Sequence, residues 1–443
     1  LALLFDSWCI ILDDPAMLRP AHLSINEENR ASTPTGEANL SATQILQLKS
    51  HMGHMAQQVY GDLFMCFNYS VVHEALVGVD EEEDQDEENI ESRNKNDILA
   101  CIGTIGRSSF LTSAEHLSTV IGTATEQAEA CIKAGQSPSQ AEILRLLETM
   151  RVATLFSCPL LVEDFKPAPT TTHSTSSEAA VLPQSVLDTT SSGNNAQAAT
   201  EGVMKLFLAV TGCLKQQMDL ISFSSAGLAH PLVSPYLLQQ LFRFLNEYLL
   251  HFFDPAADAL YYEQQHNALL HMHDGPEFNA TVEGLLAYCK QIIVTMPLEM
   301  DVVRAVASLI ATTARSAQPQ RLAFVLGTPA ITEIFHLLTA SNGQAQVCRL
   351  NEEGLAAMFK ALSWLAIKAG NTEVFVQLCS YVHGLAGEFV QVQSAKQQDK
   401  TMKLSPEHQK RLQQLVACLL GMCATPGGLD HILRELFDGV LPV

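Results

Sequence analysis

The chain of 443 residues has few basic side chains for its length. Lys and Arg total 26, against 48 Asp and Glu, which gives a formal net charge of −22 at pH 7. A negative surplus of this size is repelled by the phosphate backbone of nucleic acids and by anionic membrane surfaces. The composition therefore argues against nucleic-acid and membrane partners and favours basic protein partners.

The sequence also lacks the motifs of the commonest enzyme classes. It has no G-x-x-x-x-G-K-[ST] loop, no G-x-S-x-G turn, no H-E-x-x-H pair and no C-x-x-C pair. The segment from Gly103 to Arg107 has two glycines but no lysine, so it predicts a helix with small packing residues rather than a phosphate loop. We therefore expect no catalytic residues and no cofactor, and we expect that the chain is not an enzyme.

Paired cysteine frameworks and long apolar runs are missing as well. The 11 cysteines are scattered, and Cys213, Cys289 and Cys418 stand within apolar helical stretches, which is typical of reduced thiols. No uninterrupted apolar run approaches the roughly 18 to 20 residues that span a bilayer. The apolar start lacks the features of a signal peptide. These features predict a soluble, intracellular protein without disulfides, and the absence of an initial Met suggests a piece of a longer chain.

The dominant positive signal is helical periodicity. Apolar residues separated by three or four positions fall on one face of an α-helix, and this spacing recurs along the chain. Pro and Gly separate the periodic segments, as at Met296-Pro297 and Ser405-Pro406. The clearest apolar faces are Leu355, Met358, Phe359, Leu362, Leu365 and Ala366; Leu237, Leu241, Leu245, Tyr248 and Phe252; Val282, Leu285, Leu286, Cys289 and Ile293; and Leu412, Leu415, Val416, Leu419 and Cys423.

These signals predict an all-α fold. Helices joined by short connectors, with no strict sequence period, are typical of an α-solenoid of HEAT-type antiparallel helix pairs, and we expect one such body over residues 1–443. A compact helical bundle is the competing interpretation. The predicted helices are 1–13, 40–77, 95–109, 112–134, 138–163, 200–222, 232–253, 278–296, 299–316, 328–340, 350–369, 372–393, 406–424 and 428–440.

Three segments interrupt the helical pattern. Residues 14–39 are polar, and residues 166–200 are rich in Ser and Thr, so both are predicted to be loops, the second one disordered. Residues 79–96 form an acidic loop in which nine of the twelve residues from Asp80 to Glu91 are carboxylates. Like charges at this density repel one another and cannot pack into a core.

The acidic loop is the candidate partner-binding site. An exposed run of negative charge can attract a basic protein surface and accelerate its capture, although a solvated loop without a partner has the same composition. The candidate binding residues are Asp80, Glu81, Glu82, Glu83, Asp84, Asp86, Glu87, Glu88 and Glu91.

Histidines provide a weaker candidate for a metal site. His266, His271, His273 and Asp274 lie within nine residues, but their spacing matches no established zinc motif, and with 15 histidines in the chain we expect a chance cluster. His51 and His54 share a helix face but have no third ligand. We therefore predict no metal site.

The order of several segments resembles a known family. Phe5-Asp6-Ser7-Trp8, the pair Asp13-Asp14, the acidic run and the helix from Asp97 to Arg107 follow one another at a spacing similar to that in the middle of the exportin 4 group of importin-β-like nuclear transport receptors. The resemblance continues through Ala153 to Asp164 and covers mainly the first 165 residues.

This resemblance implies a nuclear export receptor built of HEAT repeats. Receptors of this family bind protein cargo together with the small GTPase Ran in its GTP form, and translation initiation factor 5A is a family cargo. Nucleoporins are further expected partners, and the expected location is both nucleus and cytoplasm. A general HEAT-repeat scaffold without a nucleotide-linked cycle is the alternative, because the helical pattern alone fits both.

Overall fold

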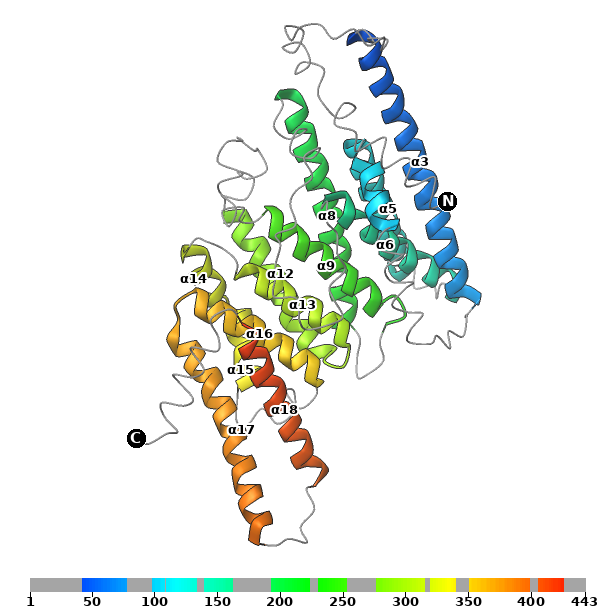
Figure 1. The fold of residues 1–443 in the computed structure, drawn as a ribbon. Coiled ribbons are helices and arrows are strands. Elements are labelled where there is room, and N and C mark those ends of the chain that lie inside the picture. The colour runs from blue at the N-terminus through cyan, green and yellow to red at the C-terminus, as the bar shows by residue number, and fades with distance from the viewer. Residues whose placement is uncertain are drawn as a thin grey trace, which may run out of the picture. The chain divides into compact units, whose positions relative to one another are not determined.

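The computed structural model describes residues 42–77, 98–107, 109–133, 139–161, 193–223, 230–252, 276–314, 319–339, 350–398 and 405–425. These residues form helices and the short connections between them, and no β-strand occurs among them (Figure 1). The all-α prediction is therefore confirmed for the described part of the chain.

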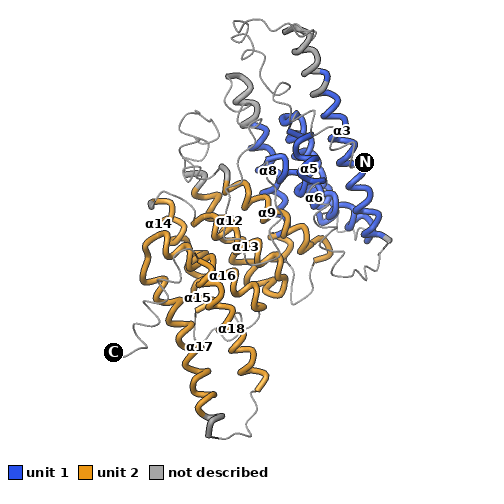
Figure 2. Tube along the Cα trace, in the orientation of Figure 1, with its two compact units in different colours: residues 1–217, 266–268 blue, residues 218–265, 269–443 orange. Residues whose placement is uncertain are grey.

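The described residues belong to two compact units (Figure 2). Unit 1 comprises residues 1–217 with 266–268, and unit 2 comprises residues 218–265 with 269–443, so that the division falls within helix α8. Unit 1 contains α3 (Ala42–Val77), a helix at Ile98–Arg107, α5 (Phe110–Lys133), α6 (Gln140–Leu161) and most of α8 (Gly193–Phe223). Unit 2 contains α9 (Pro235–Phe252), α12 (Pro276–Thr295), α13 (Met300–Thr313), α14 (Pro319–Gly327), α15 (Pro329–Thr339), α16 (Glu352–Lys368), α17 (Thr372–Gln398) and α18 (Pro406–Cys423).

Helices α8 and α14 differ most from the predictions. Helix α8 begins at Gly193, so the last part of the predicted loop 166–200 is helical, because Ala and Gln at 196–199 favour a helix despite the polar composition. Helix α14 was not predicted, since its nine residues, which begin at Pro319 and end two residues before Pro329, give too short a periodic signal. The predicted helices 1–13 and 428–440, the loops 14–39 and 79–96, and residues 166–192 lie outside the described residues.

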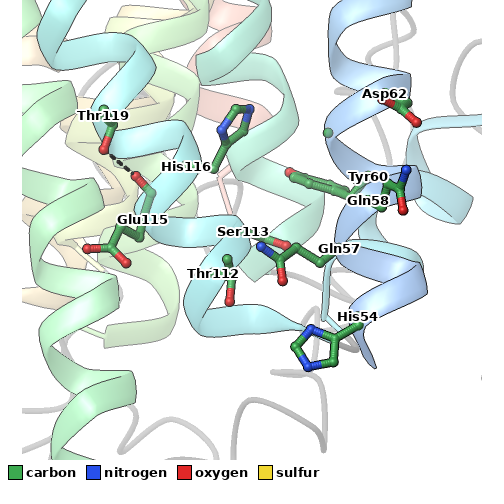
Figure 3. Close-up of a pocket in the computed structure, with 11 residues that line it drawn as sticks. His54, Gln57, Gln58, Tyr60, Asp62, Thr112, Ser113, Glu115, His116 and Thr119 are labelled. Atoms are coloured by element: carbon green, nitrogen blue, oxygen red, sulfur yellow. Dashed lines mark hydrogen bonds between the residues drawn. The ribbon is translucent and has the colours of Figure 1, made fainter. Parts of the chain in front are cut away.

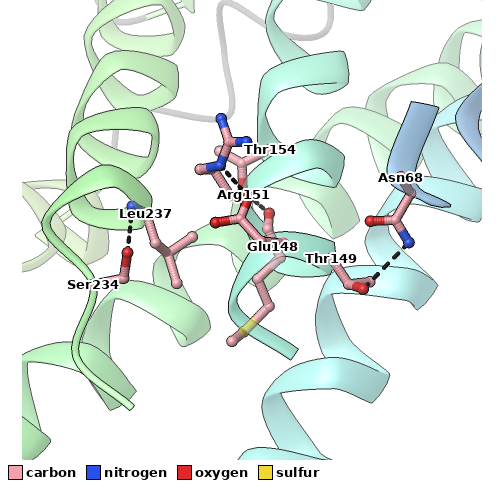
Figure 4. Close-up of polar contacts among 8 residues, drawn as sticks. Asn68, Glu148, Thr149, Arg151, Thr154, Ser234 and Leu237 are labelled. Carbon is pink, nitrogen blue, oxygen red and sulfur yellow. Dashed lines mark hydrogen bonds and ion pairs between the residues drawn. The ribbon is translucent and has the colours of Figure 1, made fainter. Parts of the chain in front are cut away.

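An aromatic cluster joins α3 to α6 in unit 1. Tyr60, Phe64 and Phe67 of α3 surround Phe156 of α6, with ring centroids 6.1, 5.5 and 5.4 Å from it. The spacing of these three residues places them on one side of the helix. The Tyr60 and Phe64 rings meet Phe156 edge-to-face, and pairs of this kind stabilise a core beyond simple burial. Asn68 Nδ2 also donates to Thr149 Oγ1 at 3.3 Å, which fixes the register of the two helices (Figure 4).

The helix at Ile98–Arg107 packs closely on the end of α6. A Cβ atom placed on Gly103 would lie 2.4 Å from the carbonyl oxygen of Pro159, so only glycine allows this approach. Arg107, buried at the same contact, donates from Nη1 to the Pro159 carbonyl and from Nη2 to Thr104 Oγ1 at 2.9 Å. The cation thus pairs with a carbonyl at the negative end of α6. The prediction that the two glycines are packing residues of a helix is confirmed.

Helix α8 packs on α5 through polar as well as apolar contacts within unit 1. Gln216 Nε2 donates to the carbonyl of Thr125 at 2.9 Å, and Lys205 Nζ lies 3.4 Å from Glu115 Oε1. Burial raises the pKa of the Cys213 thiol to about 12, which keeps this sulfur protonated beside Met150. All nine described cysteines are free thiols.

Helices of unit 2 contact one another in two rows. The first row is α9, α13, α16 and α18, in which each helix contacts the next one named. The second row is α12, α15 and α17, again with contacts between neighbours. Contacts also join α12 to α13, α16 to α17 and α17 to α18, so the chain passes alternately from one row to the other.

Side chains along the first row explain its close packing. Asn246 Oδ1 of α9 accepts hydrogen bonds from the hydroxyl groups of Ser308 and Thr312 of α13, at 3.3 and 2.6 Å. Between α16 and α18, a Cβ atom on Gly421 would lie 2.2 Å from the carbonyl oxygen of Ala356, so the two backbones nearly touch. The predicted apolar face from Leu355 to Ala366 is buried in α16, as expected from its spacing.

Helix α18 departs from the predicted face. The sequence pattern placed Val416 and Cys423 in the core, but both are exposed, and Leu420 is exposed at 62%. The buried residues are instead Gln414, Leu415, Ala417, Cys418, Gly421 and Met422. Apolar residues occur around most of this helix, so periodicity alone could not identify which side faces α16.

A sharp bend separates α14 from α15. Thr328 is the single residue between the helices and precedes Pro329, and the two axes differ by 60°. No single helix among those described is long and apolar enough to cross a bilayer. Helices α14 and α15 together meet the length and composition criteria, but they are bent relative to each other.

Candidate functional site: the cleft between α3 and α5

A cleft of about 720 Å³ lies between α3 and α5 of unit 1. Helix α3 contributes residues 54–62 and α5 contributes residues 112–119. Most of these residues follow the three- and four-residue spacing of one helix face: His54, Gln57, Gln58 and Gly61 on α3, and Thr112, Glu115, His116 and Thr119 on α5. Figure 3 shows Tyr60 and Gln57 pointing from α3 toward α5. Two helix faces from distant parts of the sequence therefore meet at this cleft. Its lining residues are His54, Gln57, Gln58, Tyr60, Gly61, Asp62, Thr112, Ser113, Glu115, His116 and Thr119.

Tyr60 forms part of the floor of the cleft. Its side chain is 1% exposed, and its hydroxyl group has no hydrogen-bond partner. Burial raises the pKa of this phenol well above its usual range, although Arg107 acts in the opposite direction, so the hydroxyl stays protonated. Gly106 makes room for the ring, because a Cβ atom there would lie 2.6 Å from Tyr60 Cε2.

His116 forms the facing part of the floor. Its ring stands edge-on to Phe64, with centroids 5.4 Å apart and an interplanar angle of 87°. The Nε2 atom is buried and has no hydrogen-bond partner. Because partial burial disfavours the charged form, the pKa of His116 is lowered from its ordinary value, and the ring is neutral at pH 7. The floor thus has two polar groups without partners and no charge.

The rim of the cleft is acidic. Asp62 and Glu115 are exposed carboxylates, and none of the eleven lining residues is Lys or Arg. Lys205 lies 3.4 Å from Glu115, but both side chains are more than half exposed, so the pair is screened by solvent. A neutral polar floor below a negative rim suits hydrogen-bond donors and positively charged groups.

The Ser, His and carboxylate residues of the cleft do not form a nucleophilic relay. The Ser113 hydroxyl donates to the carbonyl of Gly106 at 3.0 Å, and His116 Nε2 has no partner, so no hydrogen bond joins this nitrogen to Ser113. Activation of a serine requires such a bond to a base. The arrangement supports binding of polar groups and offers no activated nucleophile at Ser113.

The residues predicted from sequence as sites are only partly covered by the structure. The acidic run from Asp80 to Glu91 and the histidine cluster from His266 to Asp274 lie outside the described residues. His51 and His54 lie on α3, three residues apart and exposed, and the described residues contain no group of three or more potential metal ligands.

Comparisons of the chain with protein-family models, with curated proteins and with solved structures gave no match. We therefore interpret the site from its own chemistry and from the packing of the helices that form it.

Sequence reasoning did not find the cleft. Tyr60 and His116 are 56 positions apart, and the pattern around each of them is that of an ordinary amphipathic helix. The one available signal was the pair of glycines before Arg107, of which Gly106 accommodates the Tyr60 ring. That signal indicates close packing but says nothing about which residue fills the space.

Proposed function

We propose that this chain is a protein-binding α-solenoid that acts as a nuclear export receptor, binding a basic protein cargo together with Ran in its GTP form. The observation that carries the solenoid part of the proposal is the alternation of unit 2 between two rows of helices. In a helical solenoid each helix pair contacts mainly its neighbours, which produces such rows. A bundle around one core has no need of this order.

Charge supports a basic partner. The net charge of −22 favours association with positively charged protein surfaces and raises the rate of their capture. The acidic rim of the α3–α5 cleft, with Asp62 and Glu115, has the same sign. Both features are compatible with a receptor that recognises cargo by electrostatic complementarity.

The export-receptor part of the proposal depends on the order of sequence segments from Phe5 to Arg107 and its resemblance to the exportin 4 group. The mechanism would be one of coupled binding. A stack of helix pairs bends by small rotations between neighbours, so two ligands that stabilise the same curvature raise each other's affinity by the same factor. Hydrolysis of GTP by Ran would remove that support and release the cargo.

Binding in the presence of different nucleotides tests this function. We expect the full chain, immobilised, to retain translation initiation factor 5A more strongly with Ran-GTP than with Ran-GDP or without Ran. A coupling of 1 to 3 kcal/mol corresponds to about 5- to 150-fold in affinity. Equal retention in all three conditions across a range of cargo concentrations would rule out the transport cycle.

The alternative is a helical-repeat scaffold without a nucleotide-linked cycle. It is favoured by the same rows of helices, which require no GTPase. Partners that bind equally well with either nucleotide state of Ran, or in its absence, are the expected result for that alternative.

A further inference from the structure

Helix α3 has an apolar stripe that faces solvent. Met65, Tyr69 and Leu76 are exposed at 60%, 73% and 48%, and Val72 between them is half-buried. Large apolar side chains exposed together on one helix mark interaction surfaces more often than single exposed residues do. We call Met65, Tyr69, Val72 and Leu76 the α3 seam.

The α3 seam lies on a different side of the helix from the core. At 100° per residue, its members fall within about 60° of one another, whereas the buried residues Tyr60 and Phe64 lie about 100° or more away from Met65. Helix α3 therefore has two apolar faces. Packing against α6 uses one of them, and the other is free in the described structure.

The spacing of the α3 seam indicates the shape of its partner. Its members are separated by four, three and four residues, which is the alternation that lets side chains of one helix fit between those of another. From Met65 to Leu76 the seam is about 16 Å long, a length that a helix of 11 to 14 residues covers. Met and Tyr are also residue types that are enriched in protein interfaces.

Charge indicates the chemistry of that partner. Residues 50–77 of α3 contain two carboxylates, Asp62 and Glu74, and no Lys or Arg. Both carboxylates are exposed, and Asp62 precedes Met65 by three residues on the same side of the helix. A second copy of the chain would bring the same carboxylates and a further charge of −22, which disfavours self-association.

We propose that the α3 seam is the docking surface for a basic amphipathic helix of a partner protein. The apolar face of that helix packs on Met65, Tyr69, Val72 and Leu76, and its Lys or Arg side chains face Asp62 and solvent. This proposal rests on the protein-binding part of the proposed function and does not require its Ran-linked cycle.

A designed peptide tests the docking surface on the full chain. The probe is a fluorescein-labelled 14-residue amphipathic helix of Leu and Lys, followed by fluorescence anisotropy at low salt. We expect saturable binding that weakens about tenfold or more in the double variant Met65→Gln, Tyr69→Gln, because exposed apolar anchors carry most of the energy of such interfaces. Peptide of the same pattern with Glu in place of Lys should not bind measurably.

Leu208→Gln is the matched control, since Leu208 of α8 is also 60% exposed and lies outside the seam. It should bind the probe as the wild type does, and circular dichroism should show unchanged helix content in both variants. The proposal is overturned if the double variant binds like the wild type, if the Glu peptide binds equally well, or if the wild type does not bind the probe. A dimer that dissociates in the double variant would also overturn it, in favour of a second copy.

The result can be separated from that of the Ran experiment. Probe binding that depends on the seam, together with cargo retention that ignores the nucleotide, would uphold the docking surface and reject the transport cycle. If cargo retention depends on the nucleotide and is unchanged in the double variant, and the probe does not bind, the transport cycle is upheld and the docking surface is rejected.

Discussion

His116 has its imidazole partly withdrawn from water against Phe64, and its Nε2 atom has no hydrogen-bond partner. Desolvation lowers the pKa of this group in the folded chain, so the unfolded chain takes up the proton first as the pH falls. The stability that His116 contributes is therefore present above its ordinary pKa of about 6.5 and is lost as the pH falls through the lowered folded value.

This predicts a difference between His116→Gln and the wild type that depends on pH. Thermal midpoints measured between pH 7.5 and pH 5 should fall less steeply for the variant, because one source of preferential proton uptake by the unfolded chain is removed. His54→Gln, at an exposed position on the rim of the same cleft, is the control and should follow the wild type. Parallel curves for wild type and His116→Gln would contradict the role of burial.

At the scale of helices, stability depends on how closely the backbones of two neighbouring helices approach each other. Gly103→Ala would place a methyl group 2.4 Å from the Pro159 carbonyl oxygen, and a backbone oxygen cannot move aside as a flexible side chain can. We expect a loss of about 1 to 3 kcal/mol in the free energy of unfolding, measured by urea denaturation. Gly61→Ala, which has open space around the new methyl group, should be neutral or stabilising by up to about 1 kcal/mol. Equal effects of the two substitutions would show that the contact is not tight.

Helices are also the scale at which the sequence was most informative. The face from Leu355 to Ala366 is buried as its spacing predicted, and the two glycines before Arg107 pack as small residues. The apolar spacing did not predict the buried face of α18, because apolar residues occur on several sides of this helix. It did not predict α14 either, because nine residues are too few to show a period. It also could not pair Tyr60 with His116, because contacts between distant helices leave no local signal.

For the molecule as a whole, electrostatic attraction by its negative charge acts over a longer distance than any contact between side chains. Replacing Asp80 to Glu88 with Ser and Gly removes eight carboxylates. We expect the thermal midpoint to change little, since charges so dense do not pack, and association with a basic partner to weaken in a way that disappears at high salt. Titration of the same partner at 50 mM and 500 mM NaCl, for the wild type and this variant, measures the effect. Unchanged affinity at low salt would mean that the run only solubilises the chain.

The two rows of unit 2 also affect the order in which its helices unfold. Among the described helices, α13 and α16 each have a neighbour on both flanks of their row, whereas α9 and α18, at its two ends, each have one. Releasing α18 breaks a single flank contact within the row, but releasing α16 first would open two. Fraying within this row should therefore start at an end helix, α9 or α18, and move inward, so that the end helices determine how long α13 and α16 stay protected.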